Sequence, residues 1–118
     1  MKAERLPGGS DLSRVFDEGK STASRNLVLF YRKVDRKGGM RIAFAAGKKL
    51  GNAVTRNRLR RRLREAFRTL QGRPRSADVV LVARRTTADA PFEVLRCEMM
   101  RVLKRADLLR CSPSRAGF

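Results

Sequence analysis

One stretch, residues 48–68 with the sequence KKLGNAVTRNRLRRRLREAFR, constrains the fold of this chain more than any other. Its apolar residues recur at the spacing of a single helical face, so we predict an amphipathic helix with Thr55 as its N-cap. That face has to be buried, and it comprises Leu59, Leu63, Ala66, Phe67 and Leu70. At about 100° per residue, the opposite face carries Asn57, Arg61, Arg64 and Arg68, with Arg58, Arg60 and Arg62 on its flanks.

The outer face of this helix is almost purely cationic, because Glu65 is its only carboxylate. Exposed helices ordinarily mix the two signs, since like charges four residues apart repel each other. Arginine binds phosphate groups in a planar, bidentate way, and the amide of Asn57 adds a group that can reach a sugar or a base. The pattern therefore favours a nucleic-acid-binding helix over a merely solvated charged face.

The composition of the whole chain agrees with this interpretation. The 118 residues carry a formal net charge of +18, and 42% of them are hydrophobic. The length predicts a single domain over residues 1–118, and the charge predicts a polyanionic partner. No apolar run is long enough to span a membrane, and the N-terminus lacks the apolar segment of a secretory signal. We therefore expect a cytoplasmic protein that binds no membrane.

The N-terminal segment is predicted to contain an arm and one short helix. Residues 1–9 are basic and end in Pro-Gly-Gly, which favours a flexible arm. Ser10 is the predicted cap of the helix, and Gly19 is its predicted C′ residue. The helix carries a small apolar cluster of Leu12, Val15 and Phe16.

Three strands are predicted to follow this helix. Residues 20–25 can form an edge strand, whereas residues 27–34 and 40–46 are expected to pair as an antiparallel hairpin around a turn at 35–39. Side chains alternate between the two faces of a strand. This alternation places Val28, Phe30 and Arg32 on one face of the first hairpin strand and Leu27, Leu29 and Tyr31 on the other.

The C-terminal half is predicted to add one buried strand and one helix. A loop at residues 72–76 precedes the apolar run DVVLVAR at 78–84, which indicates a central strand. Pro91 at the N1 position starts a helix that reaches about Leu109. The predicted buried face of this helix comprises Phe92, Leu95, Met99, Val102 and Leu103. The tail at about 111–118 is expected to be unstructured.

The sequence offers no set of residues suited to catalysis by the protein. It contains no histidine, and its carboxylates are too scattered to predict a metal site. Cys97 and Cys111 lack the CxxC spacing of zinc knuckles, so we expect two free thiols, with Cys97 as a small core residue. We therefore predict no catalytic side chain and no metal held by protein side chains.

The stretch at residues 48–68 resembles the signature of the protein subunit of bacterial ribonuclease P. The Arg-Asn-Arg triplet at 56–58, preceded by Gly-Asn-Ala-Val at 51–54, is the hallmark of that family, and the flanking order agrees from about Leu6 to Leu109. The sequence departs from the family pattern at three positions. Leu12 stands where Phe is frequent, Gly47 where Ser is usual, and Arg62 where an apolar residue is common.

The resemblance implies both a fold and a function. The implied fold is an α/β (α+β) two-layer sandwich of ribosomal-protein type in the order αβββαβα, with an uncommon left-handed βαβ crossover. The implied function is that of the protein subunit of a ribonucleoprotein endoribonuclease, whose RNA removes the 5′ leader of precursor tRNA. Magnesium ions then serve the active site of the RNA, and no cofactor bound by the protein and no obligate protein partner are expected.

The resemblance also implies two RNA-binding surfaces. In that family the helix with the Arg-Asn-Arg triplet contacts the catalytic RNA, and a cleft between the sheet and the terminal helix binds the single-stranded 5′ leader. The residues at the first surface are Lys48, Lys49, Asn52, Arg56, Asn57, Arg58, Arg60, Arg61, Arg64 and Arg68. Those at the second surface are Leu12, Phe16, Phe30 and Arg32.

Two other functions are compatible with parts of the sequence. A ribosomal or other structural RNA-binding protein could carry the same basic helix, but the Arg-Asn-Arg triplet favours the ribonuclease P family. A free-standing protein nuclease is opposed by the lack of histidine and of carboxylate clusters.

A protein without acid, base or metal ligands in catalytic arrangement is predicted to be inactive alone. Purified chain freed of RNA should leave precursor tRNA uncut, and cleavage should appear when the catalytic RNA is added. The measurement is a cleavage assay on fractions across a purification that ends in nuclease treatment to remove RNA. Activity that follows the protein through complete RNA removal would contradict this prediction.

Overall fold

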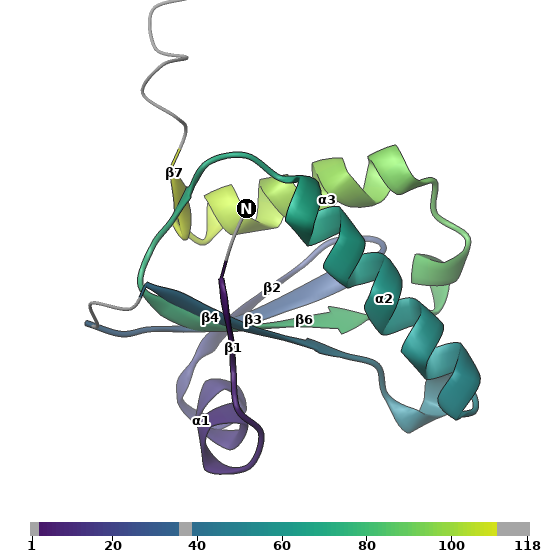
Figure 1. Cartoon of the computed structure of the whole chain (residues 1–118), viewed down its shortest axis with the longest axis horizontal. Coiled ribbons are helices and arrows are strands. Elements are labelled where there is room, and N and C mark those ends of the chain that lie inside the picture. The colour runs from purple at the N-terminus through teal and green to yellow at the C-terminus, as the bar shows by residue number, and fades with distance from the viewer. Residues whose placement is uncertain (1–2, 36–38, 111–118) are drawn as a thin grey trace, which may run out of the picture.

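The computed structural model describes residues 3–35 and 39–110, which form a mixed α+β fold around one five-stranded sheet (Figure 1). The elements in chain order are β1 (Glu4–Arg5), α1 (Ser10–Glu18), β2 (Lys20–Ala23), β3 (Leu27–Lys33), β4 (Met40–Ala45), the 3₁₀ helix η1 (Lys48–Leu50), α2 (Ala53–Thr69), β5 (Arg73–Pro74), β6 (Ala77–Ala83), the 3₁₀ helix η2 (Arg85–Ala88), α3 (Phe92–Arg105) and β7 (Leu109–Arg110). The expected α+β class is confirmed, and the main order αβββαβα holds once the two-residue strands β1, β5 and β7 are set aside.

Strand β6 occupies the centre of the sheet, whose order is β1-β4-β6-β3-β2. The prediction of a central strand at 78–84 is therefore confirmed, whereas the predicted hairpin of 27–34 with 40–46 is wrong. β6 lies between these strands, antiparallel to β3 and parallel to β4. Its run of apolar side chains can be buried on both faces, which favours the central position over an edge. Residues 36–38 of the predicted turn lie outside the described residues.

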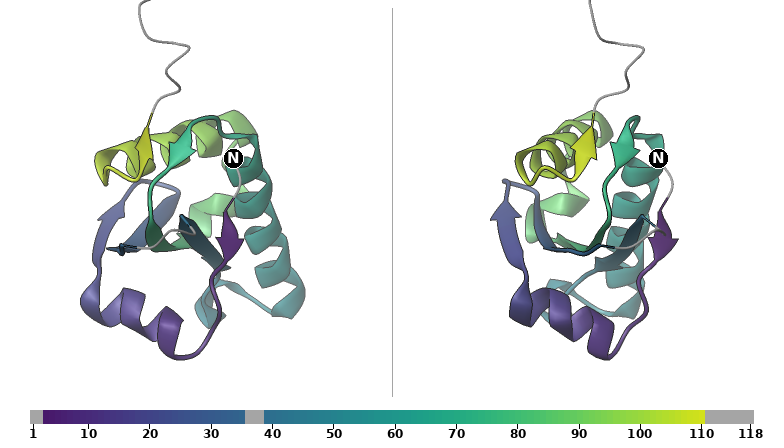
Figure 2. Two further views of the ribbon diagram at one scale, coloured as in Figure 1. Left: turned by 60° about the vertical axis from the view of Figure 1, so that its left-hand side comes forward. Right: turned by 90° about the vertical axis from the view of Figure 1, so that its left-hand side faces the viewer.

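Helices α2 and α3 cover one face of the sheet, and α1 lies on the other (Figures 1 and 2). The larger core forms between α2, α3 and the sheet, and it includes the whole predicted stripe of α2 from Leu59 to Leu70. β4, α2 and β6 form a parallel βαβ crossover unit, as the resemblance implies. The left-handedness of this crossover stays a prediction from the resemblance.

The N-terminal segment is part of the fold, so the prediction of a flexible arm fails for the residues before α1 that the structure describes. Strand β1 pairs in parallel with Arg41 and Ile42 of β4. Leu6 is only 3% exposed and packs with Val15 and Val80 in a small core beneath α1. Burial of the one large apolar residue of this segment holds the chain against the sheet.

The ends of two helices differ from the predicted caps. α2 begins at Ala53 because the side chain of Asn52, not Thr55, accepts a hydrogen bond from the Thr55 backbone N–H (2.9 Å). α1 begins at Ser10, and its N-cap residue is Gly9, which has no side chain to cap it.

α1 ends before Gly19 as the sequence predicts, but Gly19 is the C-cap residue and not the C′ residue, and its φ is −88°. A Cβ atom at this position would collide with the backbone oxygens of Tyr31 and Val15. Glycine here permits the close approach of α1 to β3, which fixes the position of the helix under the sheet.

The C-terminal region turns back earlier than the sequence predicts. α3 starts after Pro91, its N-cap residue, and ends at Arg105. Asp107 then adopts a positive φ of 60°, and the reversal buries the next two leucines and lets β7 pair with β5 inside the predicted loop 72–76. Cys97 is exposed, contrary to the core assignment, because it lies about 200° around the helix from Leu95. Cys111 and the predicted tail 111–118 lie outside the described residues.

No helix among the described residues combines the length and the apolar character that crossing a membrane requires.

Candidate nucleic-acid interface

Helix α2 presents the cationic face that its sequence predicts. Its first turn is anchored by the Asn52 cap and by the turn at Gly51, whose φ of 141° is a conformation that side chains rarely adopt. The side chains on the outer face are exposed, namely Asn57, Arg58, Arg61, Arg64 and Arg68, while Arg56 and Arg60 are half-buried. Lys48 and Lys49 are exposed in η1, immediately before the helix. The structure thus brings all ten residues of the first surface to α2 and the turn that precedes it.

Two residues of the Arg-Asn-Arg triplet have notable surroundings. The Oδ1 atom of the exposed Asn57 accepts a hydrogen bond from Arg60, and the N–H₂ group of the same amide is a donor. The buried Nε atom of Arg56 has no hydrogen-bond partner among the described residues. Guanidinium and amide N–H groups donate hydrogen bonds, and a ligand rich in oxygen atoms accepts them.

Arg62 has a different role from its neighbours on α2. Its guanidinium donates hydrogen bonds to the backbone oxygens of Thr87 (2.7 Å), Ala88 (2.9 Å) and Ala90 (2.7 Å). By its sequence position this arginine lies on the flank of the cationic face. Its guanidinium instead connects α2 by hydrogen bonds to η2 and to the segment before α3. It therefore positions the helix rather than adding to the cationic surface.

The cationic surface continues beyond α2 through residues that the sequence analysis did not select. Parallel pairing of Ala45 with Val82 brings the carboxyl ends of β4 and β6 together, so η1 and η2 start at the same end of the sheet. Leu27 pairs with Ala83, which brings the β2–β3 turn there as well. This end of the sheet carries exposed arginines at positions 25, 84 and 85. For Arg84 and Arg85, the sequence signal is their position as adjacent arginines directly after an apolar strand.

The four residues assigned to the leader surface share the face of the sheet that carries α1. The rings of Phe16 and Phe30 meet edge to face with centroids 4.8 Å apart, and Phe16 is 42% exposed. Leu12 packs beside them in the small core under α1. Arg32 follows on the same face of β3, and its Nε atom lies 3.8 Å from a carboxylate oxygen of Glu18.

A half-exposed apolar surface extends from this aromatic pair across the sheet. It is formed by Val28, Phe30, Ala43, Ala45 and Val82, which α1 covers only in part. Toward the carboxyl ends of β4 and β6 the surface ends at the cations of η1 and η2. We call these five residues together with Phe16 the aromatic face.

The opposite end of this face carries paired charges. Arg41 donates two hydrogen bonds, of 2.9 Å each, to the buried carboxylate of Asp78, and this interaction raises the pKa of Arg41. Arg32 lies in register with Asp78 at this end, away from η1 and η2. The structure therefore brings Arg32 close to Phe30 but does not bring it to the main cationic surface.

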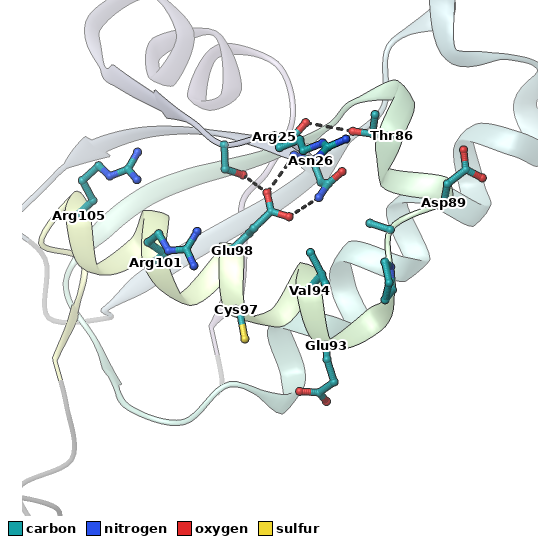
Figure 3. A pocket seen from close by; sticks show the side chains of 13 residues that line it. Arg25, Asn26, Thr86, Asp89, Glu93, Val94, Cys97, Glu98, Arg101 and Arg105 are labelled. Carbon is teal, nitrogen blue, oxygen red and sulfur yellow. Dashed lines mark hydrogen bonds between the residues drawn. The ribbon is translucent and has the colours of Figure 1, made fainter.

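A buried polar network holds the turn that carries Arg25 (Figure 3). The carboxylate of Glu98, which is 6% exposed, accepts hydrogen bonds from the Ser24 hydroxyl (2.7 Å), the Asn26 backbone N–H (3.0 Å) and the Asn26 side-chain amide. The Thr87 hydroxyl donates to the Asn26 backbone oxygen. Because Arg62 binds the backbone oxygen of Thr87, the network links α2, η2, the β2–β3 turn and α3.

The described residues contain no group of three or more His, Cys, Asp or Glu side chains arranged to hold a metal ion. The exposed cations of α2 and η1 are chemically suited to phosphate groups. A partly exposed aromatic ring is suited to stacking on an unpaired base. These features define a nucleic-acid-binding protein of the mixed α+β class.

Comparison with known proteins identifies the family. The model of the Ribonuclease P family matches residues 1–107. A "Ribonuclease P protein component" from Symbiobacterium thermophilum is 42% identical over 110 residues, which cover 92% of this chain and 96% of that protein. A solved structure of the RNase P protein of Staphylococcus aureus is similar with a TM-score of 0.77 at 29% identity, covering 92% of this chain and 100% of the other. The RNase P protein of Thermotoga maritima gives a TM-score of 0.75 at 32% identity, with 86% and 96% coverage.

The chain belongs to the ribonuclease P protein family. It is thus a protein component of a ribonucleoprotein endoribonuclease that processes tRNA, and such components function with the ribonuclease P RNA. The alternative of a ribosomal or other structural RNA-binding protein is not favoured.

The Glu98 network predicts a stability that depends on pH. Burial raises the pKa of Glu98, but hydrogen bonds from Ser24 and Asn26 outweigh it and hold the pKa below its ordinary value of 4.5. The stabilisation is therefore present above the ordinary pKa and is lost as the pH falls through the lowered one. Glu98→Gln should cost about 1–3 kcal/mol at neutral pH and lose less stability on acidification.

The measurement is chemical denaturation of the wild type and of Glu98→Gln at a series of pH values from neutral to acidic. Glu93→Gln is the matched control, because Glu93 is exposed and forms an ion pair with Arg96 on its own helix. Parallel stability curves for the wild type and Glu98→Gln would show that this carboxylate does not carry the predicted stabilisation.

Proposed function

We propose that the chain binds two RNA segments at once, the catalytic RNA through α2 and the single-stranded 5′ leader of precursor tRNA through the aromatic face. The observation that carries this proposal is the position of Phe16 and Phe30, a partly exposed aromatic pair on the face of the sheet opposite α2. An aromatic ring in that position is suited to stack on an unpaired base and is not needed for binding a phosphate backbone.

The cationic surface supports the first half of the proposal. α2 and η1 expose a row of arginines and lysines with one carboxylate among them, and such a surface binds RNA chiefly by neutralising phosphates. The exposed arginines of the β2–β3 turn and of η2 lie where the aromatic face ends. They are placed to contact the phosphates of a strand whose bases cover that face.

Such an arrangement assists cleavage by positioning and not by protein chemistry. A leader bound on one side of the sheet and the catalytic RNA bound on the other would be held in a fixed relation by the five strands. The proposed magnesium ions belong to the RNA active site, and the described part of the chain supplies no cluster of ligands for them. The proposed site of action is the cytoplasm, with no obligate protein partner.

Binding to the catalytic RNA should weaken steeply with salt, because each neutralised phosphate releases counterions. The expected slope of log affinity against log salt concentration is about 0.7–0.9 per contact. Arg58→Ala, which removes one exposed guanidinium, should reduce the slope by about one contact. Lys104→Ala, an exposed cation on α3, is the charge-matched control and should change the slope less. An affinity that stays constant across the salt series would contradict the electrostatic account.

Phe16→Ala should reduce leader binding selectively. A base stacked on the ring contributes about 1–3 kcal/mol, so the affinity of the holoenzyme for precursor tRNA should fall about tenfold. Mature tRNA, which lacks the leader, should bind as before. The measurement compares equilibrium affinities for the two tRNAs and the melting temperature of each variant.

Val94→Ala is the matched control, because Val94 is also 42% exposed but lies on α3. It should leave the difference between precursor and mature tRNA unchanged. If Phe16→Ala instead lowers the melting temperature and weakens both tRNAs equally, Phe16 acts in folding and the leader assignment is wrong.

A further inference from the structure

We infer that a second base-binding site lies in a groove between α2, β1 and the outer edge of β4, and that it holds one unpaired nucleotide of the RNA bound by α2. This inference rests on the proposed function of α2. The groove has a volume of about 1070 Å³ and is lined by residues that include Arg5, Phe44, Arg60, Arg64 and Arg68.

The groove exists because β1 is too short to cover its neighbour. β1 pairs with Arg41 and Ile42 only, and the hydrogen bond from the Leu6 N–H to the Ile42 oxygen is followed by departure of the chain toward α1. In the described part of the chain, β4 therefore has no strand beside its outer edge from Ala43 to Ala45. Backbone groups at such an edge are open to a ligand.

The charge of the groove favours a phosphate ligand. Arg5 lies in register with Ile42, whose side chain is in the core under α2, so Arg5 points to the α2 side of the sheet. Arg60, Arg64 and Arg68 reach the groove from α2, and none of the residues that line it is Asp or Glu. The groove beside Glu98 differs, since Asp89, Glu93 and Glu98 all contribute to its lining.

An aromatic wall distinguishes this groove from a simple phosphate-binding surface. The half-buried ring of Phe44 packs against the buried ring of Phe67 with centroids 6.0 Å apart, and the guanidinium of Arg64 lies 5.7 Å from the Phe44 ring centre. Bases stack on aromatic rings and on guanidinium planes, and both are present here. Cations alone are sufficient to bind the phosphates of an RNA helix. An aromatic ring beside the cations additionally allows stacking with an unpaired base.

The groove adjoins the aromatic face at Leu12 and Ala43, but its own ring and arginines lie on the other side of the sheet. Phe44 packs on the α2 side of the sheet, whereas Phe30 lies on the α1 side. The three arginines beside Phe44 belong to the helix that we assign to the catalytic RNA. Because these arginines form most of the charged lining, we assign the nucleotide in the groove to that RNA, and the crosslinking experiment below distinguishes it from a nucleotide of the leader.

The test is the affinity of the full chain carrying Phe44→Leu for the catalytic RNA across a salt series. Loss of stacking should weaken binding about tenfold at every salt concentration and leave the salt slope unchanged. Arg64→Ala should weaken binding and also reduce the slope by about one contact. Phe92→Leu is the matched control, because Phe92 is also a half-buried phenylalanine packed against the larger core but does not line the groove, so its change should not cause the same loss of affinity.

A direct measurement uses p-benzoylphenylalanine in place of Phe44 in the reconstituted holoenzyme. Photocrosslinking should yield one main adduct with an unpaired nucleotide of the catalytic RNA, mapped by reverse transcription. A crosslink to a second copy of the chain, to a paired region, or to the leader would overturn the inference. Unchanged affinity of Phe44→Leu beside weakened binding of Arg58→Ala would also overturn it and leave the proposed function intact, whereas failure of both variants to respond would count against both.

Discussion

The central position of β6 is the constraint on which the rest of the structure depends. β6 is apolar on both faces, and it separates β3 from β4 although the connection of those strands is short in sequence. Its parallel pairing with β4 requires the intervening chain to cross the sheet as α2. The same pairing brings η1, η2 and the β2–β3 turn to one end of the sheet. One strand thus determines both the core and the continuity of the cationic surface.

The arginines at the end of the sheet near η1 and η2 repel one another, and the buried polar network offsets this repulsion. Like charges on α2 and η2 repel each other, yet Arg62 joins the two elements by three hydrogen bonds to backbone oxygens. Glu98 supplies the negative charge on the other side of the network, where it fixes the Ser24–Asn26 turn. A carboxylate at the surface would compete with phosphate for the arginine side chains. The buried carboxylate of Glu98 stabilises the Ser24–Asn26 turn without contacting a ligand at the surface.

The parts of the fold that sequence could predict are those set by local periodicity. The buried stripe and the exposed cations of α2 follow from the repeat of Leu59, Leu63 and Phe67, and the two faces of β3 follow from alternation. The pairing of β6 between β3 and β4 could not be predicted in this way, because it depends on contacts between distant residues. For the same reason the sequence pattern does not reveal that Arg5, Arg25 and Arg85 lie beside these surfaces. Their positions depend on which strands pair in the sheet.

A sheet with a different surface on each side would allow so small a protein to bind the two RNA segments that we propose. The apolar residues of each strand alternate between the two cores, so every strand that supports α2 also supports the aromatic face. The rings that we propose to bind the leader can then be partly exposed, since the larger core on the α2 side carries most of the buried apolar residues. α1 covers only part of its own core, so Phe16 and Phe30 stay partly exposed. The close contact of Gly19 with β3 fixes α1 in this position, and it therefore supports the surface that we propose for the leader.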